Sequence, residues 1–130
     1  MALKLCGTCS TEKPKSAFNA DSTKPDGLQA LCRQCKSDRH RAVRYGLPKD
    51  EYRRMHDDQG GRCWICRKLP RARFALSVDH CHTTGRVRGL LCGPCNRALG
   101  IFDDDVGRLQ TAIDYLEAHP SPLDGKVDTD

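Results

Sequence analysis

Hydrophobic positions along this chain fall into short groups whose spacing changes from region to region. Residues 74–80 alternate between apolar and polar side chains, which predicts a strand, and residues 87–91 predict a second strand that follows a turn. An amphipathic helix is predicted behind the acidic residues 103–105, from the spacing of Val106, Leu109, Ala112, Ile113 and Leu116. The second half of the chain is therefore expected to contain a hairpin and helices.

The first half of the chain has few apolar residues and more turn signals. The run from residue 35 to about residue 45 is basic and helix-compatible and ends at Gly46, and glycine commonly terminates helices. A second helix is expected after Pro48 and before the glycine pair at 60–61. Residues 94–100 should form a further short helix.

The apolar content is too low to build a large core. Only 38% of the 130 residues are hydrophobic, so another source of stability is needed. No stretch reaches the roughly 20 apolar residues that a membrane-spanning helix requires, and the first residues do not resemble a secretory signal. We expect a soluble, intracellular protein with no membrane partner.

The nine cysteines supply that other source of stability. Eight of them form four C-x-x-C pairs, which are Cys6 and Cys9, Cys32 and Cys35, Cys63 and Cys66, and Cys92 and Cys95. Two such pairs complete a tetrahedral tetrathiolate zinc site. Their order favours two sequential structural zinc sites over interleaved sites, redox-active motifs or disulfides. Cys81 is predicted not to bind metal.

Positive charge is concentrated around the last two cysteine pairs. Residues 63–102 contain seven basic side chains and one acidic side chain, whereas residues 103–130 contain two basic and eight acidic ones. A field of this sign attracts polyanions, most commonly nucleic acid. A solvated surface of a mildly basic protein is the alternative interpretation.

Residues suited to metal binding and proton transfer follow the first predicted strand. Asp79, His80 and His82 belong to an Asp-His-Cys-His run, and Asn96 follows the last cysteine pair. The side-chain oxygens of Asp79 and Asn96 suit a hard cation such as Mg²⁺ or Mn²⁺. An imidazole accepts a proton near neutral pH, so His80 is a candidate general base.

Three spaced motifs lie within residues 50–118, namely Cys63-Trp64-Ile65-Cys66, Val78-Asp79-His80-Cys81-His82 and the run from Gly85-Arg86-Val87-Arg88 to Cys95-Asn96. Together they resemble the recombination endonuclease VII family of HNH (His-Me finger) nucleases. The resemblance implies a small zinc-stabilised α+β protein, with a ββα-metal core preceded by a second small zinc-binding module. It also implies that Asp79 and Asn96 hold one catalytic divalent ion, that His80 is the general base, and that His82 assists near the scissile phosphate.

The activity implied by this resemblance is metal-dependent hydrolysis of DNA phosphodiester bonds to 5′-phosphate and 3′-hydroxyl ends. Family members that resolve branched DNA are dimers with long helices after the core, and some carry an acidic residue where this chain has Leu99. Nicking or cutting of duplex DNA therefore stays as compatible as cleavage of branched DNA, with or without a homodimer. The competing hypothesis is a two-zinc nucleic-acid-binding module that does not cut.

The basic residues divide into two predicted DNA-binding groups. Backbone contacts near the site are expected from Arg86, Arg88 and Arg97, and docking contacts from Lys36, Arg39, Arg41 and Arg44. The predicted organisation is an N-terminal zinc-ribbon or treble-clef-like module over residues 1–45, a helical connector over 46–62, a nuclease-like domain over 63–119 and a disordered tail over 120–130. A cytoplasmic location in a bacterium or a phage-infected cell is expected.

Overall fold

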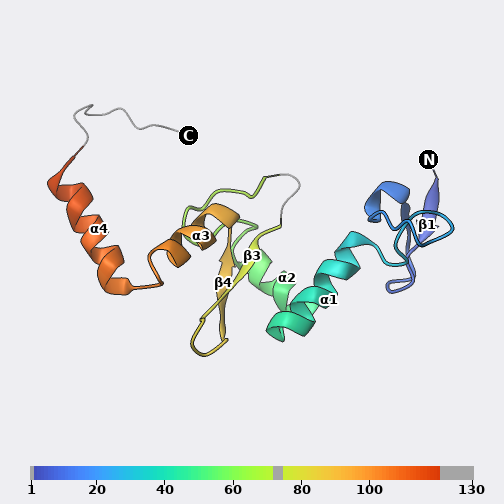
Figure 1. The fold of residues 1–130 in the computed structure, drawn as a ribbon, viewed down its shortest axis with the longest axis horizontal. Helices are drawn as coiled ribbons and strands as arrows, with labels where there is room; N and C mark the ends of the chain where they lie inside the picture. The colour runs from blue at the N-terminus through green and yellow to red at the C-terminus, as the bar shows by residue number, and fades with distance from the viewer. Residues whose placement is uncertain (1, 72–74, 121–130) are drawn as a thin grey trace. The chain divides into compact units, whose positions relative to one another are not determined.

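The computed structural model describes residues 2–71 and 75–120, and it confirms a small α+β protein. In chain order the elements are β1 (Leu3–Leu5), β2 (Glu12–Pro14), the 3₁₀ turn η1 (Lys15–Ala17), α1 (Arg33–Tyr45), α2 (Lys49–Asp58), β3 (Ser77–His80), β4 (Val87–Leu91), α3 (Gly93–Ile101) and α4 (Val106–Ala118) (Figure 1). They form two compact units, Met1–Cys92 and Gly93–Asp130, which are described in turn.

The N-terminal part of the first unit is built around cysteines. Strands β1 and β2 form an antiparallel hairpin that pairs Leu3 with Pro14 and Leu5 with Glu12. In the core that follows, Phe18 packs with Cys6 and Cys32, and all three side chains are buried. Ala17, Leu28 and Leu31 pack against this cluster but are only partly buried, so two of its three buried side chains are cysteines.

Helix α1 begins where the second cysteine pair lies. The Sγ atom of Cys32 accepts a hydrogen bond from the backbone N–H of Cys35, so Cys32 caps the helix. The helix therefore starts at Arg33, two residues before the predicted start. It ends at Gly46 as predicted, because Gly46 adopts a left-handed conformation with φ 63°.

Helix α2 and the residue that follows it connect α1 to the second hairpin through contacts of Tyr52 and Gln59. The buried hydroxyl of Tyr52 donates a hydrogen bond to the Leu76 carbonyl at 3.0 Å, and the guanidinium of Arg41 lies 3.7 Å from the Tyr52 ring centre. The Gln59 amide accepts from the Leu90 N–H at 3.0 Å and donates to the Leu90 carbonyl at 2.9 Å. The Gln59 side chain thus forms hydrogen bonds with both backbone groups of Leu90, as a third strand beside β4 would.

Strands β3 and β4 form the predicted antiparallel hairpin, with Val78 opposite Leu90 and Asp79 opposite Gly89. The register shifts between Asp79 and His80, because His80 pairs with Val87 and leaves Arg88 as an extra residue on β4. The expected strand over 74–80 is shorter, starting at Ser77, since the Leu76 carbonyl is used by α2. Phe74 lies outside the described residues.

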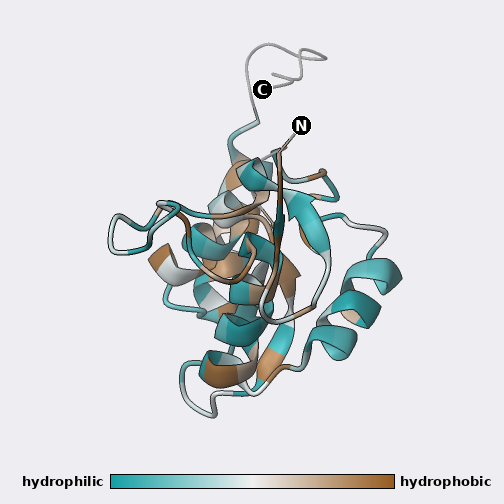
Figure 2. Cartoon of the chain, turned by 90° about the vertical axis from the view of Figure 1, so that its right-hand side faces the viewer, coloured by the Kyte–Doolittle hydropathy of each residue, from teal (hydrophilic) through white to brown (hydrophobic). Residues whose placement is uncertain are grey.

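The second unit contains α3 and α4. Asp103 and Asp104 both adopt left-handed backbone conformations with φ 54°, and Asp105 caps α4 by accepting from the Arg108 N–H at 3.0 Å. The predicted amphipathic helix is present, but no residue of either helix is buried. In Figure 2, which colours the chain by hydropathy, hydrophobic stretches are short and interrupted by hydrophilic ones.

Residues 121–130 of the predicted tail lie outside the described part of the chain. None of the helices in the described residues combines the length and the apolar composition that a membrane span requires.

Candidate functional site

The first predicted group of cysteines is a compact cluster. The sulfur atoms of Cys6, Cys9, Cys32 and Cys35 all lie within 4.8 Å of one another. The first two come from the turn between β1 and β2, and the last two come from the start of α1. The Nζ of Lys13 also donates a hydrogen bond to the Cys32 sulfur at 3.1 Å. The turn between β1 and β2 and the N-terminus of α1 therefore meet at this cluster.

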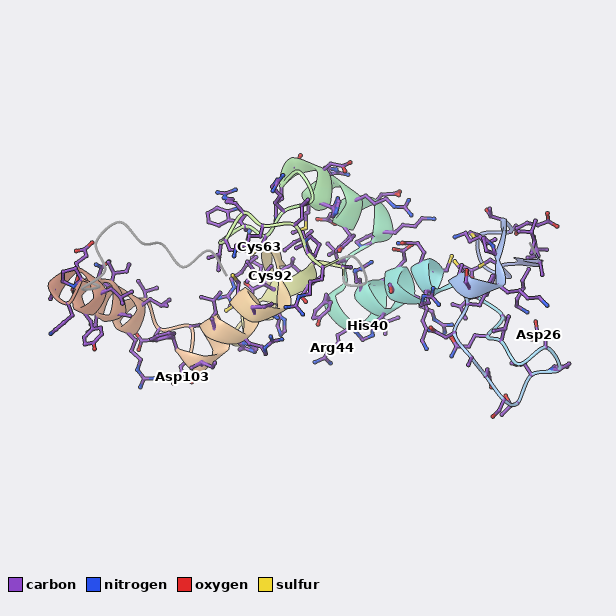
Figure 3. All side chains as sticks on the ribbon, turned by 90° about the horizontal axis from the view of Figure 1, so that it is seen from above. Asp26, His40, Arg44, Cys63, Cys92 and Asp103 are labelled. Atoms are coloured by element: carbon purple, nitrogen blue, oxygen red, sulfur yellow. The ribbon has the colours of Figure 1, made fainter. Side chains whose placement is uncertain are left out.

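The second predicted group forms a matching cluster. The sulfur atoms of Cys63, Cys66, Cys92 and Cys95 again lie within 4.8 Å of one another, and Cys63 and Cys92 are labelled in Figure 3. All nine cysteines are free thiols, and Cys81 belongs to neither cluster. The predicted grouping into two sequential four-cysteine sets is confirmed.

The protonation chemistry of both clusters fits a bound dication. Backbone N–H groups of Cys9 and Cys32 lower the pKa of Cys6 to about 6. Burial raises the pKa of Cys63, but the backbone N–H groups of Cys92 and Cys66 outweigh it and bring that pKa to about 6.

One thiol of the first cluster, that of Cys35, is harder to ionise. Burial and the neighbouring sulfur atoms raise the pKa of Cys35 to about 12. Several thiolates can share so small a space only when a cation balances their charge, and zinc is the common partner of four cysteine sulfurs.

Asp79 is the most specifically held of the predicted site residues. Its carboxylate is buried, and Arg88 donates to both oxygens, from Nε at 2.7 Å and from Nη2 at 2.9 Å. The register shift of the hairpin places these two residues side by side. The predicted metal ligand and the predicted DNA contact are thus partners of each other in this structure.

His80 lies at the end of β3 among aromatic rings. Its ring centre is 5.2 Å from that of Tyr45 at the end of α1 and 4.9 Å from that of His82. His80 is partly exposed and His82 is exposed. Packing by two rings restricts how the His80 imidazole can turn, while the partial exposure leaves it accessible to a water molecule or a substrate.

The other predicted residues have different surroundings. Arg86 is exposed in the loop of the second hairpin, and Asn96 and Arg97 follow Cys95 on α3 in the second unit. On α1, Lys36, Arg39 and Arg44 are exposed.

Arg41 differs from these residues, because it is buried and paired with Asp38 at 3.4 Å and stacks on Tyr52. Its guanidinium is used inside the protein. We therefore do not retain Arg41 as a DNA contact.

Sequence reasoning missed two residues that shape the site. Tyr45 contacts His80, and Gln59 holds β4 through both backbone groups of Leu90. The helix prediction already placed Tyr45 at a helix end, but nothing in the local pattern indicated which strand that end would meet. Gln59 precedes a glycine pair and looked like an ordinary helix terminus.

These features define a protein in which two four-cysteine clusters hold small α+β modules together. Asp79 and His80 lie on the β3–β4 hairpin of the second module. The family model described as recombination endonuclease VII matches residues 38–118. This match covers more than half of the chain, so the chain belongs to the recombination endonuclease VII family, as the motif resemblance indicated.

Two curated phage proteins are similar in sequence. The Gene 59 protein of Mycobacterium phage D29 is 50% identical over 78 residues, which is 59% of this chain and 47% of that protein. The Gene 59 protein of Mycobacterium phage L5 is 46% identical over 78 residues, or 59% of this chain and 48% of that protein. The aligned segment thus spans about half the length of these relatives.

Among solved structures, the crystal structure of the ββα-Me type II restriction endonuclease Hpy99I is similar to this chain. The sequence identity is 29% and the TM-score is 0.42, with 89% of this chain and 65% of that chain covered.

Proposed function

We propose that this protein is a metal-dependent DNA endonuclease. The observation that carries the proposal is a buried carboxylate, Asp79, that directly precedes the accessible and ring-packed imidazole of His80, at the end of a strand within the family-matched residues. Hydrolysis of a phosphodiester needs a base for water and a cation for the developing negative charge. This strand end offers a site for both.

The role proposed for His80 is that of general base. One imidazole nitrogen takes a proton from water as the water oxygen bonds to phosphorus and the bond to the 3′-oxygen breaks, and the leaving 3′-oxygen takes a proton from a solvent water. The products are a 5′-phosphate and a 3′-hydroxyl. Tyr45 and His82 keep the His80 ring in orientation, and His82, which is exposed, is available to contact the phosphate.

The residues proposed to hold a catalytic divalent ion are Asp79 and Asn96. Both offer oxygen donors of the kind that a hard divalent ion prefers, and in this structure Arg88 donates to both carboxylate oxygens of Asp79. When bound, Mg²⁺ or Mn²⁺ would supply Lewis-acid stabilisation of the charge on the phosphate. On release from Asp79, Arg88 is proposed to bind a phosphate oxygen.

The two four-cysteine clusters are proposed to hold structural zinc, supported by their geometry and by the pKa values of Cys6 and Cys63. DNA is the proposed substrate, with further contacts from Arg86 and Arg97, and cleavage of branched DNA is one form this activity could take. The exposed apolar residues Val106, Ile113 and Leu116 on α4 would suit a homodimer. The proposed place of action is the cytoplasm of a host cell.

A second candidate function is nucleic-acid binding without cleavage. The Asp79–Arg88 pair favours it, because Arg88 already satisfies both carboxylate oxygens without a metal ion.

The two candidates are distinguished by a plasmid-nicking assay with Mg²⁺ or Mn²⁺ on the zinc-loaded protein and on His80→Ala. We expect nicking by the parent and a loss of about 10²–10⁴-fold in the variant. Equal activity of the two proteins would remove His80 from the mechanism, and no activity in either would favour the binding module. His119→Ala is the matched control, because His119 is an exposed histidine at the end of α4.

A further inference from the structure

A groove lies between α1 and the segment that leads into β3, within the first unit. Its volume is about 510 Å³, and its walls include Arg33, Lys36, His40 and Tyr45 on one side and residues 75–78 on the other. Among the described residues that line it, none is acidic. The groove is therefore open to a negatively charged chain along its whole length.

The basic side chains follow one side of α1. Arg33, Lys36 and His40 are spaced by three and four residues, which places them along one face of a helix. Figure 3 labels His40 on this helix. From residue 33 to residue 45 the helix rises about 18 Å. That length corresponds to about five nucleotide steps of a duplex strand at about 3.4 Å each.

Arg33 is held in position at the start of this face. Its guanidinium donates to the backbone carbonyls of Ser16 and Phe18. Lys36 and His40 are exposed and can turn toward a ligand. The positive charge is therefore fixed at one end of the groove and adaptable along its middle.

The other end of the groove reaches the candidate general base. The Tyr45 ring lies 6.2 Å from the His40 ring and 5.2 Å from the His80 ring, measured between ring centres. The three rings form a continuous path from the middle of α1 to the end of β3. A chain lying in the groove would therefore be directed to His80.

We propose that this groove holds the sugar-phosphate backbone of one strand of the substrate DNA and delivers it to His80. Lys36 contacts a phosphate, Arg33 and His40 line the same path, and Tyr45 marks its end at the site. This inference rests on the proposed nuclease function. An acidic peptide would also match the charge, but the groove leads to a residue suited to phosphodiester chemistry, so a nucleic acid is the occupant we propose.

The test compares two charge reversals in the His80→Ala protein, with zinc retained and no added Mg²⁺. Lys36→Glu changes the groove, whereas Lys49→Glu makes the same change on α2, where Lys49 is exposed and does not line the groove. Binding of a fluorescein-labelled DNA duplex is measured by anisotropy over a series of salt concentrations. We expect Lys36→Glu to weaken binding and to reduce the log–log salt slope by about 0.9, and Lys49→Glu to leave the slope unchanged.

Other outcomes overturn the groove proposal in distinguishable ways. Equal weakening by both variants would mean that only overall charge matters. If Lys36→Glu binds DNA normally and the parent protein with His80 cuts DNA, the groove proposal is wrong and the nuclease proposal stands. Absence of DNA binding and cutting in the parent would remove both proposals. Lys36-dependent binding of poly-glutamate that is tighter than binding of DNA would identify an acidic polypeptide as the occupant.

Discussion

The two four-cysteine clusters are alike in construction and different in what surrounds them. In each, a turn supplies two cysteines, and the other two flank or occupy the first turn of a helix. Around the first cluster lie Phe18 and, hydrogen-bonded to a cysteine sulfur, Lys13. The second cluster is linked by β4 to Asp79 and His80, which lie on the paired strand.

This difference indicates that the clamp and the chemistry are separable. A four-cysteine site fixes the ends of elements, but it assigns no reactivity to the residues that those elements carry. In the second hairpin the reactive residues stand on a strand whose partner ends directly before Cys92, so the cluster fixes the hairpin at its base. In the first module the corresponding hairpin has no acid and histidine pair. The first cluster is therefore expected to support α1 and the groove.

The largest expected effect comes from removing one cluster at a time. Cys6→Ser and Cys63→Ser should each lose one of two bound zinc ions, and with it an apparent binding free energy on the order of 10–16 kcal/mol. Elemental analysis of the purified variants gives the stoichiometry, and plasmid nicking gives the activity. We expect Cys63→Ser to abolish nicking, because the catalytic hairpin loses its base, and Cys6→Ser to weaken it.

Cys81→Ser is the control for the zinc count, because Cys81 belongs to neither cluster and both ions should remain. Two zinc ions in Cys63→Ser would contradict the assignment of the second cluster. Equal loss of activity in Cys6→Ser and Cys63→Ser would contradict the separation of the two roles.

A smaller effect is expected from Arg88→Met, which removes both hydrogen bonds to Asp79. The carboxylate would stay buried without its cation, so the free energy of unfolding should fall by about 2–4 kcal/mol. If Arg88 and a divalent ion compete for Asp79, added Mn²⁺ should raise the melting temperature of Arg88→Met more than that of the parent.

Arg86→Met is the matched control, because it removes the same charge from the same hairpin. Equal stabilisation of Arg88→Met and the parent by Mn²⁺ would show that the ion and Arg88 do not compete. Thermal melts in zinc-containing buffer give this result without any activity measurement.

Much of this arrangement could be predicted from local sequence patterns. The C-x-x-C spacing indicated both clusters, since two thiols on one turn already face the same point. Gly46 and Pro48 correctly bounded α1 and α2. What the sequence could not indicate are contacts between distant elements, such as Tyr45 with His80.

The hairpin shows the same limit in more detail. Its existence followed from alternation, but a one-residue register shift brought Arg88 to Asp79, and no local pattern marks such a shift. Arg41 illustrates the reverse case. In the sequence it is one of several basic residues on a helix, and only tertiary packing on Tyr52 distinguishes it from its exposed neighbours.

A further prediction concerns Gln59, which supports the second hairpin and has no described counterpart in the first module. Gln59→Ala leaves the N–H of buried Leu90 without its acceptor, whereas the Leu90 carbonyl still accepts from the Trp64 N–H, so the free energy of unfolding should fall by about 1–2 kcal/mol. Gln59→Glu keeps an acceptor for the Leu90 N–H, so the free energy of unfolding should fall less in this variant. Denaturant unfolding measures both.

Gln110→Ala removes an exposed side-chain amide from α4 and should change the free energy of unfolding by less than about 0.5 kcal/mol. If Gln59→Ala changed the free energy of unfolding as little as Gln110→Ala, the Gln59 amide would not take the place of a third strand.

The smallest expected effect belongs to the first module, where Lys4 forms an ion pair with Asp26 near the surface. The Lys4 ammonium and the Leu28 N–H lower the pKa of Asp26, so the stabilising carboxylate is ionised at neutral pH and is lost only as the pH falls through that lowered value. Lys4→Met should therefore slightly weaken protection of the amides in residues 3–14 against hydrogen exchange, by the same amount at about pH 6 and pH 8. Salt at about 1 M should shrink the difference, because the pair is partly exposed. Lys15→Met, another exposed lysine of this module, is the control, and an equal loss of protection there would assign the effect to overall charge.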